Sequence, residues 1–90
     1  MPLIDIRDLR VHIIWKLFHR GCFGKISKYG NTVLSGIPAN LRYEAKKQLE
    51  KLVKEGVIIE KPHKFGIKYY LNIKNKNIWI NEIEKVKSLY

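Results

Sequence analysis

The hydrophobic spacing of the chain changes sharply at Gly56. Residues 39–55 place apolar side chains three or four positions apart, which predicts a helix that starts after a proline and ends at this glycine. Residues 57–72 instead alternate apolar and polar side chains on both sides of a turn at residues 62–66, which predicts a β-hairpin. A helix followed directly by a hairpin restricts the chain to folds that mix α and β structure.

Three further segments have helical spacing, at residues 6–20, 31–35 and 77–89. The first is predicted to run from an N-cap at Asp5 to a glycine, and the second from an N-cap at Asn31. Between them, residues 22–30 predict a loop with a short strand at residues 23–26. The chain has 90 residues and is predicted to form a single, mostly helical α+β domain over residues 1–90.

The charge of the chain points to an anionic partner. Eighteen lysines and arginines against eight acids give a formal net charge of +10 and a pI near 9.9. A small domain this basic repels itself, so we expect it to bind nucleic acid or, as the second candidate, an anionic membrane surface. The membrane is disfavoured, because the basic residues share a helix whose apolar face is needed for the core.

Neither an enzyme nor a metal or cofactor site is indicated, and we expect no catalytic residues. The acids are scattered, and no glycine-rich phosphate loop or activated nucleophile is recognisable. His19 and Cys22 lie three residues apart, but zinc needs three or four ligands. The single cysteine cannot form an internal disulfide, no apolar run reaches the roughly 18–20 residues that cross a bilayer, and the N-terminus has no signal-peptide pattern. A cytoplasmic protein is therefore expected.

The order helix, short helix, long helix and hairpin over residues 6–72 resembles the winged helix-turn-helix superfamily. Its strongest part is residues 49–62, LEKLVKEGVIIEKP, where a helix ending L-x-x-L-V-x-x-G runs into an alternating strand. A wider pattern resembles small basic archaeal winged-helix proteins and comprises Gly36-Ile37-Pro38, Leu41-Arg42, Glu44-Ala45-Lys46-Lys47, Lys61-Pro62, Phe65-Gly66 and Leu71-Asn72. The resemblance implies a three-helix core with a β-hairpin wing and an extra C-terminal helix.

The resemblance also implies which residues meet nucleic acid, because in winged helices the exposed face of the long helix enters the major groove. The groove-facing positions are Asn40, Tyr43, Lys46 and Lys47. The expected phosphate contact and positioning groups are Arg42, Lys28, Asn31 and Thr32. The wing residues expected on the backbone are Lys61, His63, Lys64 and Lys68.

Each of these sets has a structural alternative. Lysines on the long helix can simply solvate an exposed face, Lys68 can protect a sheet edge from pairing with another chain, and Asn31 can serve only as a helix cap. Residues 16–47 contain seven basic residues and one acid, and this local excess favours the binding interpretation of the long helix.

A second line of polar and aromatic side chains follows the first helix at His12, Trp15 and His19, and Trp79 lies in the last helix. One interpretation is that the C-terminal helix folds over the first helix and buries both tryptophans. The other is that these four residues form a face for a homodimer or another partner. The two interpretations are compatible, because terminal helices make the dimer in many winged-helix proteins.

The predicted function is non-enzymatic binding of nucleic acid, with duplex DNA favoured and a role as a transcriptional regulator or an architectural protein of the nucleoid. One alternative is binding of structured RNA, for instance as a ribosome-associated protein. Another is a winged helix that binds a protein partner.

Overall fold

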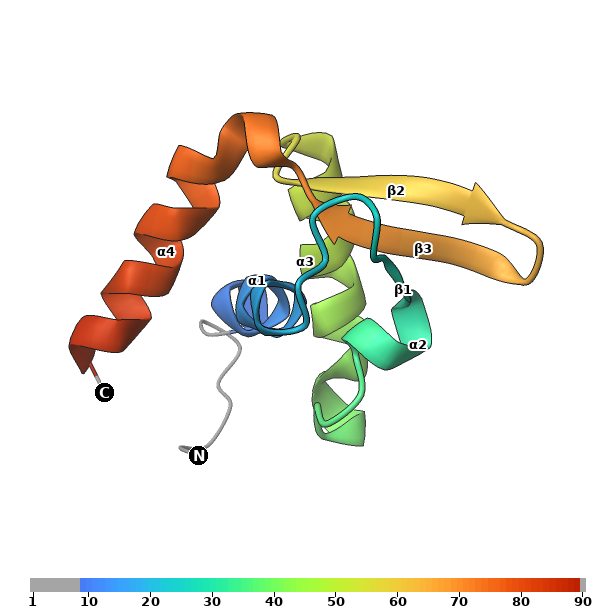
Figure 1. Cartoon of the computed structure of the whole chain (residues 1–90). Coiled ribbons are helices and arrows are strands. Elements are labelled where there is room, and N and C mark those ends of the chain that lie inside the picture. The colour runs from blue at the N-terminus through green and yellow to red at the C-terminus, as the bar shows by residue number, and fades with distance from the viewer. Residues whose placement is uncertain (1–8, 90) are drawn as a thin grey trace.

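The computed structural model describes residues 9–89, with the side chains of residues 9–84. Over this range the chain forms four α-helices and a three-stranded sheet (Figure 1). The helices are α1 (Leu9–His19), α2 (Gly30–Val33), α3 (Arg42–Lys54) and α4 (Lys76–Leu89), and the strands are β1 (Lys28–Tyr29), β2 (Ile58–His63) and β3 (Gly66–Leu71). Two 3-10 turns, η2 (Ala39–Leu41) and η3 (Ile73–Asn75), lead into α3 and α4. The prediction of a mostly helical α+β structure is confirmed.

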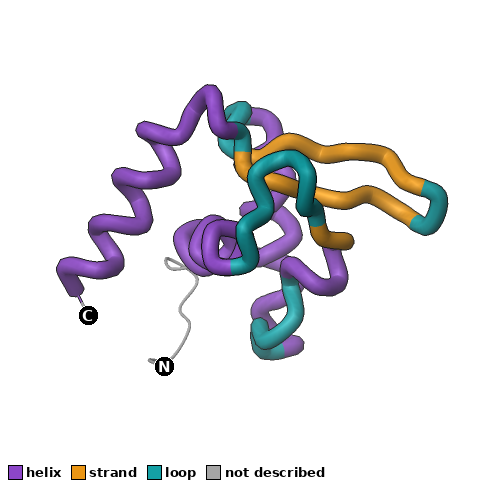
Figure 2. The backbone as a smooth tube through the Cα atoms, in the orientation of Figure 1, coloured by secondary structure: helices purple, strands orange, loops and turns teal. Residues whose placement is uncertain are grey.

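The sheet is antiparallel, with the strand order β1-β3-β2. Strands β2 and β3 form the hairpin, in which Ile58 lies opposite Leu71 at the base and His63 lies opposite Gly66 at the tip. The hairpin projects from the helical body on the side away from α4 (Figure 1, Figure 2). Its base is therefore held by the core, while its tip extends beyond the helices.

The core is built around α1, which packs against α3, α4 and the hairpin base. Its main cluster of buried side chains comprises Ile13, Ile14, Leu17, Cys22, Val33, Leu49, Leu52, Val57, Ile58, Leu71, Trp79 and Ile83. A smaller cluster of Leu9, Ile37 and Ala45 joins the start of α1 to α3. Burying one leucine or isoleucine side chain stabilises a fold by about 1.5–3 kcal/mol, so these contacts hold α3 and the hairpin base as one unit.

Helix α3 ends at Gly56 in a Schellman turn, at the point where the hydrophobic spacing changes. Gly56 has a φ of +78°, its N–H donates to the Val53 carbonyl, and the next N–H, of Val57, donates to the Leu52 carbonyl. The Gly56 carbonyl in turn accepts hydrogen bonds from the side-chain amides of Asn72 at 2.9 Å and Asn75 at 2.8 Å. The end of α3 is thereby bonded to the segment that leaves the hairpin.

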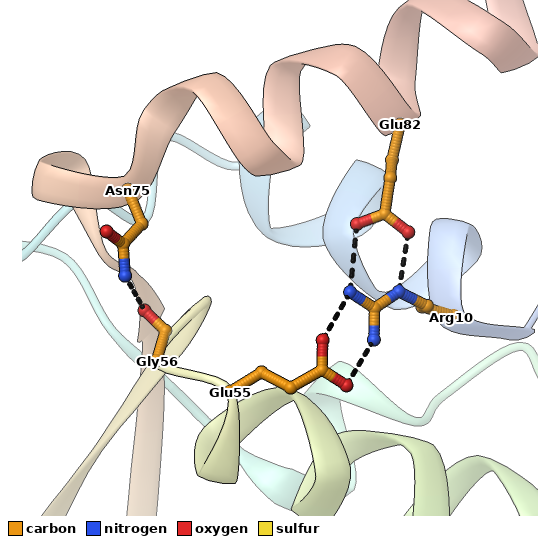
Figure 3. Close-up of polar contacts among 5 residues, drawn as sticks. All are labelled: Arg10, Glu55, Gly56, Asn75 and Glu82. Atoms are coloured by element: carbon orange, nitrogen blue, oxygen red, sulfur yellow. Dashed lines mark hydrogen bonds and ion pairs between the residues drawn. The ribbon is translucent and has the colours of Figure 1, made fainter.

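Arg10 of α1 joins three helices through one guanidinium (Figure 3). Its Nε and Nη2 donate to the Glu82 carboxylate of α4 at 2.5 and 3.2 Å, and its Nη1 and Nη2 donate to the Glu55 carboxylate at 2.9 and 2.8 Å. Burial lowers the Arg10 pKa, but the hydrogen bonds that Arg10 donates to both acids, together with their negative charge, outweigh it, and the pKa lies above its ordinary value. Two of the acids that look scattered in the sequence therefore share one cation.

The prediction of a strand at residues 23–26 is wrong, because these residues form bends. The strand β1 lies further along, where Lys28 pairs with Tyr69 and Tyr29 pairs with Lys68. The short helix α2 then begins at Gly30 and not at residue 31, and its N-cap residue is Tyr29, without a side-chain capping bond.

Asn31 lies inside α2, so the prediction of an N-cap at this residue is wrong. The turn predicted at residues 62–66 is also too long. Pro62 belongs to strand β2 and lies opposite Ile67, and only Lys64 and Phe65 connect the two strands. A proline fits this position because β2 is an edge strand, where a missing N–H can face solvent.

The other predicted boundaries differ by a few residues. The long helix predicted over 39–55 begins as the 3-10 turn η2, and α4 begins one residue before the predicted start at 77. The N-cap predicted at Asp5 and the helical residues 6–8 lie outside the described residues. None of the helices formed by the described part of the chain is long and apolar enough to cross a membrane.

Replacing Gly56 by alanine is expected to lower the free energy of unfolding by about 1–2 kcal/mol, because an L side chain is strained at this positive φ. An added Cβ would also lie 3.1 Å from the Asn75 side-chain nitrogen. Urea unfolding followed by tryptophan fluorescence measures the change. Lys51→Ala, on the exposed surface of α3, is the control and is expected to stay within about 0.5 kcal/mol of the unmodified chain.

Replacing Arg10 by methionine is expected to cost about 1–3 kcal/mol at pH 7, because two carboxylates lose their shared donor. The hydrogen bond from Arg10 holds the pKa of Glu55 below its ordinary value of 4.5 in the folded state. The stabilisation is therefore complete above pH 4.5 and is lost as the pH falls through the lower folded-state pKa. Arg10→Met should flatten the acid limb of the stability–pH curve, and an acid limb unchanged in this variant would contradict the assignment.

Candidate nucleic-acid interface

One face of α3 is open to solvent along its length. Ala45, Leu49 and Leu52 turn inward to the core, and among the described residues nothing covers the opposite positions. The predicted groove-facing residues Asn40, Tyr43, Lys46 and Lys47 are all exposed, and so is Arg42. The sequence therefore placed the apolar and polar faces of this helix correctly.

Two of these side chains are held on the helix surface. The Lys47 Nζ lies 4.5 Å from the centre of the Tyr43 ring and 4.0 Å from the Glu44 carboxylate. The Nε of Arg42 donates to the Ile37 carbonyl at 3.3 Å, which ties the start of α3 to the preceding turn. The exposed side chain of Tyr43, 69% accessible, gives this cationic face an aromatic surface.

The basic side chains of the hairpin gather on one of its faces. Strand register places Lys61 opposite Lys68 and Lys68 opposite Tyr29, and paired residues of an antiparallel sheet point to the same side. The Tyr29 hydroxyl lies 3.1 Å from His63 Nδ1, and the Lys68 Nζ lies 4.8 Å from the Tyr29 ring. We call Tyr29, His63 and Lys68 the tip cluster.

The other face of the sheet is less basic near its base. Tyr69, between Lys28 of β1 and Glu60 of β2, is half-buried. Burial raises its pKa, and the nearby carboxylates of Glu60 and Glu50 raise it further. Acidic side chains of α3 and β2 therefore lie near the gap between α3 and the hairpin base.

A hollow of about 590 Å³ lies between α3, the start of α2 and the hairpin tip. It is open to solvent and is lined by Tyr29, Gly30, Asn31, Thr32, Lys46, Phe65, Gly66, Ile67 and Tyr69. Three predicted binding residues, Asn31, Thr32 and Lys46, meet here from two helices. The hollow thus joins the long helix to the hairpin in one concave surface.

Phe65 is the residue of this surface that the sequence reasoning missed. It lies in the hairpin turn and is 80% exposed, with the Lys64 Nζ 5.5 Å from its ring centre. Turns normally use glycine, proline, asparagine, aspartate or serine, so a large aromatic residue at this place is the signal that could have marked it.

Trp79 does not belong to an exposed partner face, so that part of the prediction is wrong. It is 2% exposed, its ring centre lies 5.8 Å from those of Phe18 and Phe23, and its Nε1 donates to the Asn72 carbonyl at 3.0 Å. The buried position follows from α4 packing against α1. Trp15 is only half-buried, so the packing of α4 covers one tryptophan fully and the other in part.

The other residues of that stripe lie along α1. Trp15 stacks on His19 with ring centres 5.5 Å apart, and His19 is exposed. His12 is half-buried, and among the described residues its buried Nε2 has no hydrogen-bond partner. Burial and the nearby Lys16 lower the pKa of His12, which favours the neutral ring.

Lys16 lies within the charge-rich segment, but its ammonium group is bound within the fold. Its Nζ donates to the backbone carbonyl and the hydroxyl of Ser35, so it anchors α1 to the turn after α2. Burial, with Arg20 and Arg42 nearby, lowers the pKa of Lys16. Lys16 therefore stabilises the fold. The excess of basic residues in segment 16–47 overstates the positive charge that a ligand can meet.

The described residues form no group of three or more His, Cys, Asp or Glu side chains that could hold a metal ion. Cys22 is buried in the core, and burial raises the pKa of its thiol. No protein-family model matches the chain, and comparisons with curated proteins and with solved structures found no match. The candidate site therefore rests on the geometry of this chain alone.

Replacing Tyr29 by phenylalanine is expected to loosen the hairpin tip, because the ring beneath Lys68 remains but the hydrogen bond to His63 is lost. A typical hydrogen bond contributes about 0.5–1.5 kcal/mol, so the cost in global stability should not exceed this range. Amide hydrogen exchange in β2 and β3 should become faster. Tyr43→Phe is the matched control, and an equal increase in exchange for that variant would contradict the role of the tip cluster.

Proposed function

We propose that the chain is a winged-helix protein that binds duplex DNA, with α3 in the major groove and the β2–β3 hairpin as a wing on the adjacent backbone. The observation that carries this proposal is the shared concave surface between α3 and the hairpin, which Lys46 lines from one side and Phe65 from the other. A duplex meets both elements at once only if they border one surface.

The exposed side chains of α3 supply the base and phosphate contacts. Tyr43 lies at its N-terminal end with Lys46 and Lys47, Asn40 lies in the preceding turn η2, and all four are exposed. Asparagine can bond adenine with two hydrogen bonds, and lysine can reach guanine or phosphate. On the wing, Lys64 lies in the tip turn. Lys61 and Lys68 carry their charges, and His63 its imidazole, on the sheet face opposite Tyr69, so the wing is proposed to meet the neighbouring backbone with its tip and this outer face.

Most acids of the described chain divide into two groups. Glu55 and Glu82 are paired with Arg10 where α1, α4 and the end of α3 meet. Glu44, Glu50 and Glu60 remain on α3 and β2, so the proposed surface carries lysines with acids among them. Only four of the 18 basic residues are arginines, the usual strong base readers, so phosphate contacts should dominate affinity over sequence.

Structured RNA is the second candidate, favoured by the exposed Phe65 at the wing tip, because aromatic side chains stack on unpaired RNA bases. A direct competition between a random DNA duplex and a structured RNA of equal length separates the two candidates. The proposal expects the DNA duplex to compete better. Stronger competition by the RNA would show that structured RNA, and not DNA, is the target.

The affinity for a random duplex should fall with salt, with a slope of log K against log salt of about −5, as expected if roughly six cations meet phosphates. Fluorescence anisotropy at four salt concentrations measures this slope. The double substitution Lys46→Gln and Lys47→Gln should reduce the size of the slope by about 2 and weaken binding at least about tenfold at low salt.

The matched control is Lys74→Gln with Lys76→Gln, which removes the same charge from exposed residues of η3 and the first position of α4. It should change affinity much less, because these residues lie outside the concave surface. A slope near zero for the unmodified protein would refute nucleic-acid binding. Equal losses in the two double variants would refute the assignment to α3.

A further inference from the structure

We propose that the hollow between α3 and the wing tip receives one unpaired base of the bound DNA, with an adjoining phosphate on Lys46. This inference rests on the proposed function and names its substrate class, a duplex interrupted by an extrahelical base. It assigns a role to Phe65, Lys46 and Asn31, which differ in chemistry but line one hollow.

The aromatic side of the hollow is the first argument. Phe65 leaves 80% of its surface in water, and its neighbour on the same hollow, Ile67, leaves 42%. The described core does not include Phe65, and the two-residue turn does not require an aromatic side chain. An exposed apolar surface beside cations marks a place where a ligand binds, and bases stack on such rings whatever their sequence.

The polar side of the hollow is the second argument. Lys46 brings a cation from α3, and Asn31 and Thr32 bring an amide and a hydroxyl from α2. The N-cap of α2 is Tyr29, so capping does not occupy the Asn31 side chain. An aromatic surface, hydrogen-bonding groups for a base edge and a cation for phosphate together match the three parts of a nucleotide.

The openness of the hollow favours a base that belongs to an already bound DNA strand over a separate small molecule. Its volume of about 590 Å³ falls in the range of roughly 300–1,000 Å³ that is usual for small-ligand sites. Such sites, however, bury about 70–90% of the ligand surface, and the exposed Phe65 leaves this one too open. A base on a strand already held by α3 and the wing arrives at a high effective concentration and needs less enclosure.

The position of the hollow fits a base that has left the helical stack. It lies between the element proposed for the major groove and the element proposed for the backbone, so it faces a sugar–phosphate strand. A bulged base has no pairing partner, so moving it out of the stack costs less free energy than extruding a paired base. A fully paired duplex offers no base to the hollow.

Three DNA duplexes of one sequence test the inference: fully paired, with a single bulged adenosine, and with the same bulge lacking its base. The bulged adenosine duplex should bind about tenfold more tightly than the other two, because one base stacks on the aromatic surface. Phe65→Ala should abolish this preference, and Phe65→Trp should retain it. Lys46→Gln should weaken binding of the bulged duplex.

Ile73→Ala is the matched control, because Ile73 is 54% exposed and lies outside the hollow. This variant should keep the full preference for the bulged adenosine. Equal binding of all three duplexes overturns the inference and leaves duplex binding standing. Equal preference for both bulged duplexes, or a preference that survives Phe65→Ala, also overturns it, because flexibility of the DNA would then explain the result. Failure to bind any of the duplexes overturns both proposals.

Discussion

The arrangement of the molecule depends on how α3 gives way to β2 at Gly56. The N–H of Val57 bonds back to the helix, and the Gly56 carbonyl accepts two asparagine side chains from the segment after β3. Helix, first strand and the exit from the second strand are therefore bonded at one point. This junction sets the direction of the hairpin relative to α3, and both proposals need the two elements to border one surface.

Arg10 complements this junction from the other side. Its bonds to Glu55, the residue before Gly56, and to Glu82 of α4 connect the end of α3 to both terminal helices. The same guanidinium pairs with two carboxylates, which reduces the negative charge that these acids present to other groups. A count of charged residues does not show this pairing, which joins residues far apart in the sequence.

The parts of the fold that the sequence predicted correctly are those with a repeated pattern. The apolar stripe of α3, its end at Gly56 and the alternation in the hairpin each extend over several residues, so local spacing specifies them. β1 has two residues and no pattern, and it forms only because β3 offers it an edge. Pro62 looked like a turn residue because its position on the outer strand is a tertiary property.

The candidate site also has parts that local spacing predicts and parts that it does not. The exposed lysines of α3 follow from helical spacing, whereas the hollow needs three distant segments in contact, and no spacing rule brings Phe65 to Lys46. The Arg10 hydrogen bonds join residues that lie 45 and 72 positions apart, so local spacing could not predict them either. Spacing left Trp79 open between burial under the C-terminal helix, which the structure shows, and a partner face, because an aromatic residue on a helical stripe suits both.

Pro62 in the outer strand has a consequence for how the molecule behaves at high concentration. The outward edge of β2 would otherwise offer a regular row of N–H and carbonyl groups to a neighbouring chain, and the arm that bears it stands clear of the body (Figure 1). A proline breaks that row, and the charge of Lys61 beside it repels a second copy. The projecting arm is thereby protected against strand-to-strand aggregation.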